Sequence, residues 1–446
     1  MSNRYDALII GGGHNGLVCA FYLAKAGMKV RVLERRDIVG GAAVTEEFHP
    51  GFRNSTASYT VSLLRPKVIA DMKLHDHGYR VIERTISNFF PFPDTYLKLG
   101  GGPGRTEAEF ARFSKKDAEA YPRYDAALEK VANVLRDISL QTPPNVGGGM
   151  AALKSAAMQG WPIAKLDIAT QRDLLDIFTR SARDFLDGWF EDDHVKSAFA
   201  FDAVVGNYAG VSTPGSAYVL LHHVFGEVNG KLGAWGHSVG GMGAITQAMA
   251  KACAEVGVEI SLEAPVAKVL VNNGKAAGVK LEGGEEFYAP IVAANVGPAL
   301  LYRKLVESSD LGFNRRMKSY KTGSGTFRMN VALSELPDFT VLPGKDLAEH
   351  HTAGIIIAPG MDYMDQAFID AQQKGWSKKP IVEIKIPSTV DDSLAPPGQH
   401  VASLFCQQFD PTVDWDKHRE KVADLIIDTV TAHAPNFKAS VIARQI

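Results

Sequence analysis

The sequence predicts an α/β protein that contains a parallel sheet and more than one domain. The chain has 446 residues, about three times the ~150 residues that a single domain typically uses. Hydrophobic residues make up 46% and charged residues 22% of the chain, which is the composition of a folded globular protein. Near the N-terminus, a short apolar run, a glycine-rich turn, a helical segment and a second apolar run follow one another, as in a βαβ unit. These observations exclude a disordered chain, a coiled coil and a fibrous repeat.

The first thirty-four residues contain a glycine motif between two apolar runs. The predicted order is strand 7–10, glycine turn 11–16, helix 17–26 and strand 29–33, with Glu34 at the end of the second strand. The continuous apolar run ALII is typical of a strand buried on both faces. The turn that follows this strand has the spacing G-x-G-x-x-G, which in this context indicates dinucleotide binding by a Rossmann-like domain.

Each residue type in this motif has a physical reason. Gly11 permits the tight turn, Gly13 lets the backbone approach a pyrophosphate, and Gly16 lets the helix pack closely on the strand. The amides at the start of the helix then face the phosphates. Glu34 is placed to accept hydrogen bonds from ribose hydroxyls.

The motif alone does not separate FAD from NAD(P), but two features favour FAD. The motif starts close to the N-terminus, and Gly40 and Gly41 form a second glycine pair soon after Glu34. Adjacent glycines let a backbone lie against a pyrophosphate or a flat flavin ring, where a Cβ would clash. The predicted cofactor-binding residues of this segment are Gly11, Gly13, His14, Asn15, Gly16, Glu34, Arg35, Gly40, Gly41 and Ala42.

The string GGGHNGLVCAFYLAKAGMKVRVLERRDIVGGAAVTEE resembles the phytoene dehydrogenase-like branch of the FAD-dependent amine oxidase superfamily. The resemblance implies an FAD-dependent oxidoreductase of the dehydrogenase or desaturase type, in which a substrate passes a hydride to flavin N5. It also implies that the main chain at Val266 binds the adenine. Asn295, which ends the apolar run 290–294, is a further predicted cofactor-binding residue. Trp235 and His237 are implied as substrate-side contacts. An apolar substrate is implied by similarity to polyene and retinol saturases.

The chain is expected to pass between two domains. The predicted parts are a first FAD-binding part (1–85), a mainly helical insertion (86–234), a second FAD-binding part (235–300) and a substrate domain with a mixed sheet (301–446). This is a discontinuous FAD/NAD(P)-binding domain with an inserted α+β substrate domain. Long helices are expected at 107–140, 171–190, 244–256 and 415–433. Strands are expected at 258–262, 266–271, 276–281, 285–288, 290–294, 325–334, 380–387 and 400–407.

Composition also bounds the partners and the compartment. The net charge of −2 supplies no electrostatic surface for nucleic acid, and no polybasic block suggests an anionic membrane. The three cysteines are far apart, so reduced thiols in a cytoplasmic setting are expected; for eukaryotic relatives, the resemblance implies the mitochondrial matrix. No signal peptide, transit peptide or transmembrane segment is visible in the sequence. A small-molecule substrate is expected, while peripheral membrane contact and protein partners stay open.

Two other classes of function stay open. Gly236-His-Ser-Val-Gly240 fits the nucleophile elbow of a serine hydrolase, with Asp392 and His433 downstream, but the elbow requires a buried strand before it and this segment reads as a loop. The other alternative is a flavin-fold regulatory or interaction protein with little turnover. No residue is identified as catalytic. The paired histidines at 75/77, 222/223 and 350/351 are interpreted as loop or surface residues, and no metal is expected.

The family has a second FAD-binding segment near its C-terminus, and the sequence up to Ile446 does not show it. We therefore expect residues 1–446 alone to bind FAD weakly or not at all. The flavin absorbance of the purified chain checks this. A yellow protein with near-stoichiometric flavin would contradict the expectation.

Overall fold

The computed structural model describes residues 3–145, 147–307 and 311–446, and these form two compact units. The first unit comprises Met1–Ile82, Gly236–Gly323 and Val390–Pro397. The second comprises Glu83–Trp235, Ser324–Thr389 and Gly398–Ile446.

The structure differs from the expected division at the third boundary. Residues 301–323 stay in the first unit, because the turn that starts at Leu301 brings Leu301 and Leu305 into that unit's core. Residues 390–397 return to the first unit, where their short helix contacts the strand Phe52–Ser55. The expectation that all of 301–446 leaves the first unit is therefore corrected.

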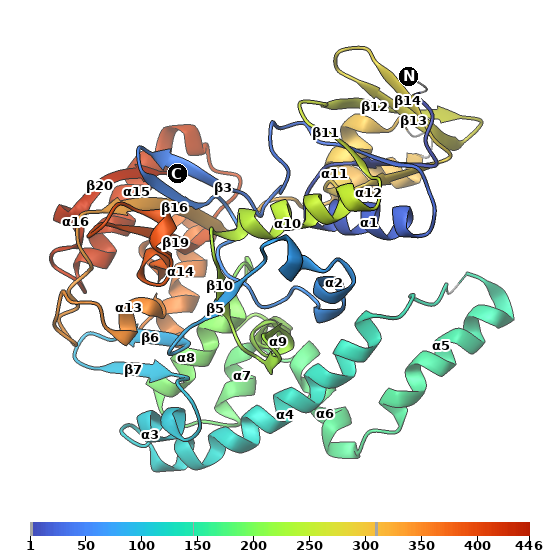
Figure 1. Ribbon diagram of the computed structural model, residues 1–446. Coiled ribbons are helices and arrows are strands. Elements are labelled where there is room, and N and C mark those ends of the chain that lie inside the picture. The colour runs from blue at the N-terminus through green and yellow to red at the C-terminus, as the bar shows by residue number, and fades with distance from the viewer. Residues whose placement is uncertain (1–2, 146, 308–310) are drawn as a thin grey trace. The chain divides into compact units, whose positions relative to one another are not determined.

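The first unit is built on a four-stranded parallel sheet with the order β11-β2-β1-β15 (Figure 1). Its strands are β1 (Ala7–Ile10), β2 (Val30–Leu33), β11 (Glu259–Ser261) and β15 (Ile291–Ala294). All four residues of β1 are buried, which explains its continuous apolar sequence. Helices α1 (His14–Lys25) and α10 (Met242–Glu255) pack on each other, α1 against β1 and β2 and α10 against β11.

A three-stranded antiparallel sheet shares a core with the parallel sheet. Its strands are β12 (Val266–Asn272), β13 (Lys275–Leu281) and β14 (Glu286–Tyr288). Val279 and Phe287 pack with Leu8 in that core. The turn between β12 and β13 places Asn273 at φ 50° and Gly274 at φ 75°, the conformation that a two-residue hairpin requires, and it joins the two strands that were predicted at 266–271 and 276–281. The remaining elements of the first unit are β3 (Thr45–His49), β4 (Phe52–Ser55), α2 (Pro66–Asp71), η1 (Leu74–His77), β5 (Val81–Glu83, at the boundary between the units), β10 (Gly236–Ser238), α11 (Pro298–Leu300), η3 (Leu301–Leu305), α12 (Leu311–Ser319) and η5 (Asp392–Leu394).

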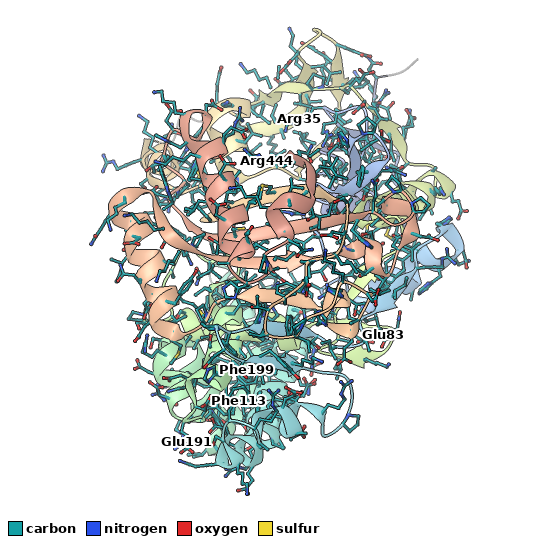
Figure 2. The ribbon with its side chains drawn as sticks, turned by 90° about the vertical axis from the view of Figure 1, so that its left-hand side faces the viewer. Arg35, Glu83, Phe113, Glu191, Phe199 and Arg444 are labelled. Atoms are coloured by element: carbon teal, nitrogen blue, oxygen red, sulfur yellow. The ribbon has the colours of Figure 1, made fainter. Side chains whose placement is uncertain are left out.

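The second unit contains a seven-stranded sheet with the order β20-β16-β19-β18-β17-β6-β7. Its strands are β6 (Asn88–Pro91), β7 (Tyr96–Leu99), β16 (Thr326–Leu333), β17 (Gly354–Ile357), β18 (Trp376–Lys385), β19 (His400–Phe409) and β20 (Val441–Gln445). Only the β17–β6 pair is parallel. One face is apolar and carries Met329, Ile384 and Leu404, which share a core with Ile426 of α15 (Trp415–Thr431). Arg444 of β20, labelled in Figure 2, forms ion pairs with two carboxylates of α15.

Helices make up the rest of the second unit. They are α3 (Arg105–Phe110), α4 (Lys115–Ser139), α5 (Gly149–Ala164), α6 (Ile168–Thr179), α7 (Ala182–Asp187), α8 (Asp193–Val204), η2 (Ser216–Leu220), α9 (Leu221–Phe225), α13 (Glu349–Thr352), α14 (Met361–Lys374), η4 (Pro387–Thr389) and α16 (Phe437–Ser440), with the short strands β8 (Glu227–Val228) and β9 (Lys231–Leu232). The helical core centres on aromatic rings: Tyr124 lies 4.8 Å from Phe199 and 5.0 Å from Phe190, measured between centroids. Phe199 is labelled in Figure 2.

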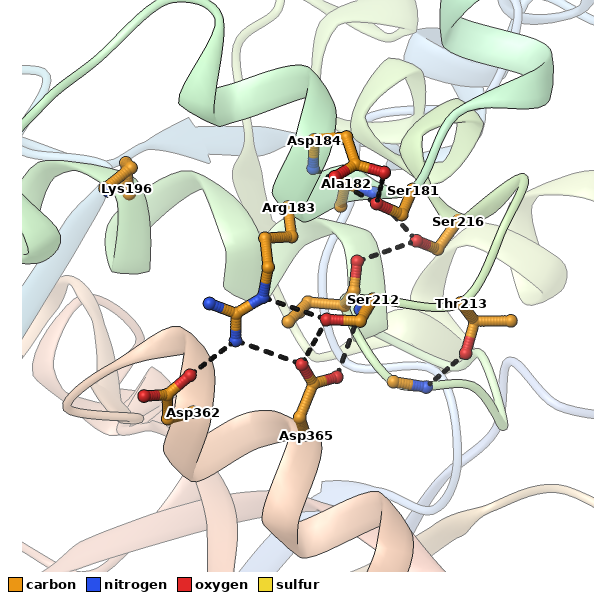
Figure 3. Close-up of polar contacts among 12 residues, drawn as sticks. Ser181, Ala182, Arg183, Asp184, Lys196, Ser212, Thr213, Ser216, Asp362 and Asp365 are labelled. Atoms are coloured by element: carbon orange, nitrogen blue, oxygen red, sulfur yellow. Dashed lines mark hydrogen bonds and ion pairs between the residues drawn. The ribbon is translucent and has the colours of Figure 1, made fainter.

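A polar network ties α7 to α14 within this unit (Figure 3). The Arg183 guanidinium donates to Asp362 at 2.7 Å and to Asp365 at 3.0 Å. Asp365 also accepts hydrogen bonds from the backbone N–H and the hydroxyl of Ser212, at 3.0 and 2.5 Å. The Asp365 carboxylate therefore connects three segments, namely α14, α7 and the loop that contains Ser212. A single exposed ion pair would connect only two.

Most predicted elements are confirmed within a few residues, but the helix expected at 171–190 is two helices, α6 and α7, because Ser181 caps the start of α7. The helix expected at 107–140 is two helices, because Ser114 caps α4 by accepting a hydrogen bond from the Asp117 N–H at 3.1 Å. The region 86–234 is mainly helical as expected, but its strands β6 and β7 also extend the large sheet. None of the helices in the described part of the chain is long and apolar enough to cross a membrane.

Candidate functional site

The glycine turn lies at the carboxyl end of β1, between β2 and β15. Gly11 has φ 96°, and a Cβ there would lie 2.9 Å from the Asn295 carbonyl oxygen. A Cβ on Gly13 would lie 2.9 Å from Asn295 Nδ2, and one on Gly16 would collide with the Gly11 carbonyl oxygen. Close backbone packing therefore requires Gly11 and Gly16, and at Gly13 a Cβ would displace the Asn295 side chain. The turn leads into α1, where Gly13 is the N-cap residue and no side chain caps the helix, so amides of the first turn face outward for an anion.

Glu34 points inward, toward the turn. Its carboxylate accepts hydrogen bonds from the N–H of Gly12 at 2.7 Å and of Arg36 at 3.0 Å. The side chain is buried, at 6% exposure. Each carboxylate oxygen keeps a further lone pair, so Glu34 can accept ribose hydroxyls while it remains bonded to the turn. The carboxylate and the amides of the turn thus fit the adenosine diphosphate part of FAD.

The second glycine pair lies directly against the first turn. Gly40 donates its N–H to the Gly12 carbonyl at 2.9 Å. Gly41 has φ 59°, and a Cβ on it would lie 3.2 Å from the Gly13 Cα. The two loops therefore meet backbone to backbone, and this leaves a cradle that side chains at these positions would fill.

Two residues distant in sequence complete this neighbourhood. Asn295 donates its N–H to the Ile10 carbonyl at 2.8 Å and its Nδ2 to the Gly11 carbonyl at 3.4 Å. Val266 begins β12, two residues after Ala264, which donates its N–H to the Glu34 carbonyl at 2.8 Å. Of the other predicted residues, His14, Asn15, Arg35 and Ala42 are exposed. The structure thus gathers these positions at one edge of the parallel sheet, and their cofactor contacts stay predictions.

His237 is held by a partner that the sequence analysis missed. Its Nε2 lies 2.9 Å from Asp391 Oδ2, and both side chains are buried. Burial alone would raise the pKa of Asp391, but hydrogen bonds from His237, Ser393 and the Gly240 N–H outweigh it and hold that pKa well below its usual value. Asp391 lies more than 150 residues from His237, so no local pattern could pair them.

The structure does not favour the serine-hydrolase alternative. Ser238 is 1% exposed, and its hydroxyl has no hydrogen-bond partner among the described residues. The buried carboxylate near this segment is that of Asp391, and it pairs with His237. His433, the histidine considered for the triad, belongs to the other unit. The N-terminus of α10 is instead fixed by Ser55 and Thr45, whose hydroxyls accept from the N–H groups of Met242 and Gly243.

The second unit buries a cluster of titratable side chains on the other face of its sheet. Glu383 and Lys385 of β18 form an ion pair at 3.0 Å, and both are 6% exposed. His223 Nε2 lies 3.3 Å from Asp202 Oδ1, close but not aligned as a hydrogen bond. His222 completes the set, with its ring 4.9 Å from that of His223. We call these five residues the buried cluster.

Burial dominates the titration of this cluster. It lowers the pKa of Lys385 to about 8, with a further contribution from the Arg84 cation. It raises the pKa of Asp202 well above the usual carboxyl range and lowers that of His223. The Nδ1 atoms of His222 and His223 have no hydrogen-bond partner within the described ranges. Trp235 packs on both rings, with centroids 5.2 and 5.1 Å away.

Two interpretations of histidine pairs are corrected here. His222 and His223 lie half-buried on α9 and are not surface residues. His350 and His351 are 3% and 0% exposed, and His351 contacts the Pro337 carbonyl at 3.0 Å. Pairs of adjacent histidines carry no sequence signal for burial, because the partners that enclose them come from distant segments.

The fold and the site define a dinucleotide-binding flavoprotein. The chain belongs to the family described as flavin-containing amine oxidoreductase, which matches residues 16–326, so it is an FAD-dependent oxidoreductase. It is 37% identical over 470 residues to pyridine nucleotide-disulfide oxidoreductase domain-containing protein 2 of Rattus norvegicus, covering 99% of this chain and 81% of that protein.

More distant proteins share the same fold. Prolycopene isomerase 2 of an Oncidium hybrid cultivar is 24% identical over 467 residues, covering 100% of this chain and 72% of the isomerase. The crystal structure of an oxidoreductase from Methanosarcina mazei superposes with a TM-score of 0.61 at 17% identity, covering 99% of this chain and 87% of that one. The resemblance to phytoene dehydrogenase-like proteins and the predicted FAD-binding fold are thereby confirmed.

We expect Glu34→Gln to weaken the binding of ADP about tenfold, or about 1.4 kcal/mol. The substitution keeps the shape of the side chain but removes the charge and one acceptor that would face the ribose. Isothermal titration of the chain with ADP measures the change, and Glu47→Gln, an exposed glutamate of β3, is the matched control. Equal affinity in both variants would show that Glu34 does not bind the ribose.

We expect Lys385 to make stability rise with pH. Its folded pKa of about 8 lies below the ~10.4 of an unfolded lysine. Between these values the unfolded chain holds the proton and the folded chain has released it. The free energy of unfolding should therefore rise by up to about 3 kcal/mol from pH 8 to pH 10.4, relative to the variant Glu383→Gln/Lys385→Met. Urea denaturation across this pH range measures it, and parallel profiles for the two proteins would contradict it.

Proposed function

We propose that this protein is a dehydrogenase or desaturase-type flavoenzyme that removes a hydride from an apolar small-molecule substrate. The observation that carries the proposal is the cradle formed by the two glycine turns and the inward carboxylate of Glu34. FAD, when bound, supplies at its N5 atom the acceptor for the hydride, and an external acceptor reoxidises it.

The first unit positions the cofactor. The Glu34 carboxylate would hold the ribose, and the amides of the first turn of α1 would face the diphosphate. Gly40 and Gly41 let the backbone approach the cofactor without a clash. These groups bind and orient, and none of them is required to change protonation during a reaction.

We assign the handling of the substrate to the second unit. Its sheet presents a continuous apolar face to α15 and a polar face that carries the buried cluster. The raised pKa of Asp202 favours its protonated carboxyl, and the lowered pKa of His223 favours its neutral imidazole. With 3.3 Å between Asp202 Oδ1 and His223 Nε2, this pair can hold or release one proton in a dry environment.

The apolar nature of the substrate is supported by similarity. The relatives include a prolycopene isomerase, and the opening motif resembles that of polyene-modifying enzymes.

The cytoplasmic localisation and the absence of a nucleic-acid partner stay predictions from composition.

The test is the anaerobic loss of oxidised-flavin absorbance in the flavin-loaded protein, measured with a panel of apolar alkenes and a panel of amines. We expect the alkenes to bleach the flavin and the amines to leave it oxidised. Bleaching by amines alone would overturn the apolar assignment, and bleaching by neither panel would leave the dehydrogenase proposal without support.

The same assay tests the role of the Asp202–His223 pair. We expect Asp202→Asn to slow bleaching about 10²-fold at unchanged flavin content. Asp137→Asn, at an exposed position of α4, is the control. An unchanged rate in Asp202→Asn would exclude the pair from the reaction.

A further inference from the structure

Helix α5 exposes an unusual set of large apolar side chains. Met150 is 81%, Leu153 64%, Met158 66% and Trp161 60% exposed. Within α5, only Ala152 is buried, and the main neighbour of this helix is α4. Figure 1 shows α5 at the edge of the second unit, running beside α4. A contiguous exposed apolar surface of this kind marks a binding surface.

The exposed residues share one side of the helix. At 100° per residue, the four apolar side chains fall within a sector of about 140°. Lys154 and Lys165 lie in the same sector and are exposed. The segment from Gln141 to Leu166 contains these two lysines and no aspartate or glutamate. The face is therefore apolar and cationic together.

We propose that this face of α5 docks on the surface of a lipid bilayer, and that anionic lipids strengthen the contact. Amphipathic helices with large apolar residues and lysines bind in the plane of the membrane interface. Indole rings prefer that interface, and lysine stems lie along apolar surface while their ammonium groups reach the phosphates. With two lysines rather than a polybasic block, apolar burial supplies most of the binding and the charge adds to it.

The arrangement of charge favours a bilayer over a second copy of the chain. Lys165 Nζ lies 5.3 Å from the centroid of the Trp161 ring, so an ammonium group sits beside the largest apolar side chain. In a symmetric contact between this face and the same face of a second copy, that ammonium would lose its water without an anion to replace it, because α5 itself carries no carboxylate. A headgroup phosphate would replace the water. The proposal stands independently of the proposed function, although a membrane surface is where apolar substrates concentrate.

The test is co-sedimentation of the full-length protein with vesicles of phosphatidylcholine, with and without phosphatidylglycerol. We expect binding to both, several-fold tighter with the anionic lipid, and the anionic enhancement to decline as salt is raised. Met150→Gln/Leu153→Gln/Trp161→Gln should weaken the apparent affinity for both vesicles at least tenfold. Leu232→Gln/Leu347→Gln/Ile369→Gln, at three exposed apolar positions elsewhere in the second unit, should not.

Charge reversal separates the contribution of the lysine charges from that of apolar burial. Lys154→Glu/Lys165→Glu should abolish the preference for anionic vesicles, whereas Lys378→Glu/Lys379→Glu, at two adjacent exposed lysines of β18, should keep it. Sedimentation velocity of the wild type and of the triple α5 variant tests whether a second copy of the chain covers this face instead of a bilayer. Absence of vesicle binding by the wild type, equal binding by the triple variant, or a dimer that this variant dissociates would each overturn the proposal.

Discussion

The close approach of three backbone segments, possible only where side chains are missing, is the constraint on which the cofactor site depends. β1 ends in a turn whose glycines leave room for Asn295 on one side and for the Gly40–Gly41 loop on the other. The Glu34 carboxylate closes the same turn through the Gly12 N–H. Strand, turn, helix and return strand are thereby held in one geometry by contacts within the protein, and a site whose groups are fixed in this way favours tight recognition.

The parts of this site that the sequence could predict are those in which local pattern and chemistry coincide. The turn 11–16 and Glu34 lie within one βαβ unit, and their spacing is set by the unit itself. Asp391 could not be identified, because it reaches His237 from a short loop that leaves the second unit and returns to it. Its residue type is ordinary, and only the three-dimensional arrangement gives it a partner.

The second unit shows the same limit on a larger scale. Strands β16, β18 and β19 were predicted at 325–334, 380–387 and 400–407, and the structure pairs them in one sheet. The burial of the opposite face, with Glu383 and Lys385, has no counterpart in the strand pattern, because charged residues are rarely buried unless another segment pairs with them or covers them. The helices that bring Asp202 and His223 to this face come from a segment about 160 to 180 residues earlier in the chain, so the pattern of the strand could not reveal its neighbours.

The order of strands in the parallel sheet also bears on how the chain is made. β1 and β2 emerge first from the ribosome, but their outer neighbours β15 and β11 begin at Ile291 and Glu259. At roughly 5–20 residues per second, the nascent βαβ unit formed by β1, α1 and β2 waits on the order of tens of seconds until β11 and β15, which pair with its two edges, have been synthesised. During this interval the apolar strand β1 lacks a partner strand at one edge and is open to contact with other nascent chains. A sheet made from strands that are neighbours in sequence would pair sooner after synthesis.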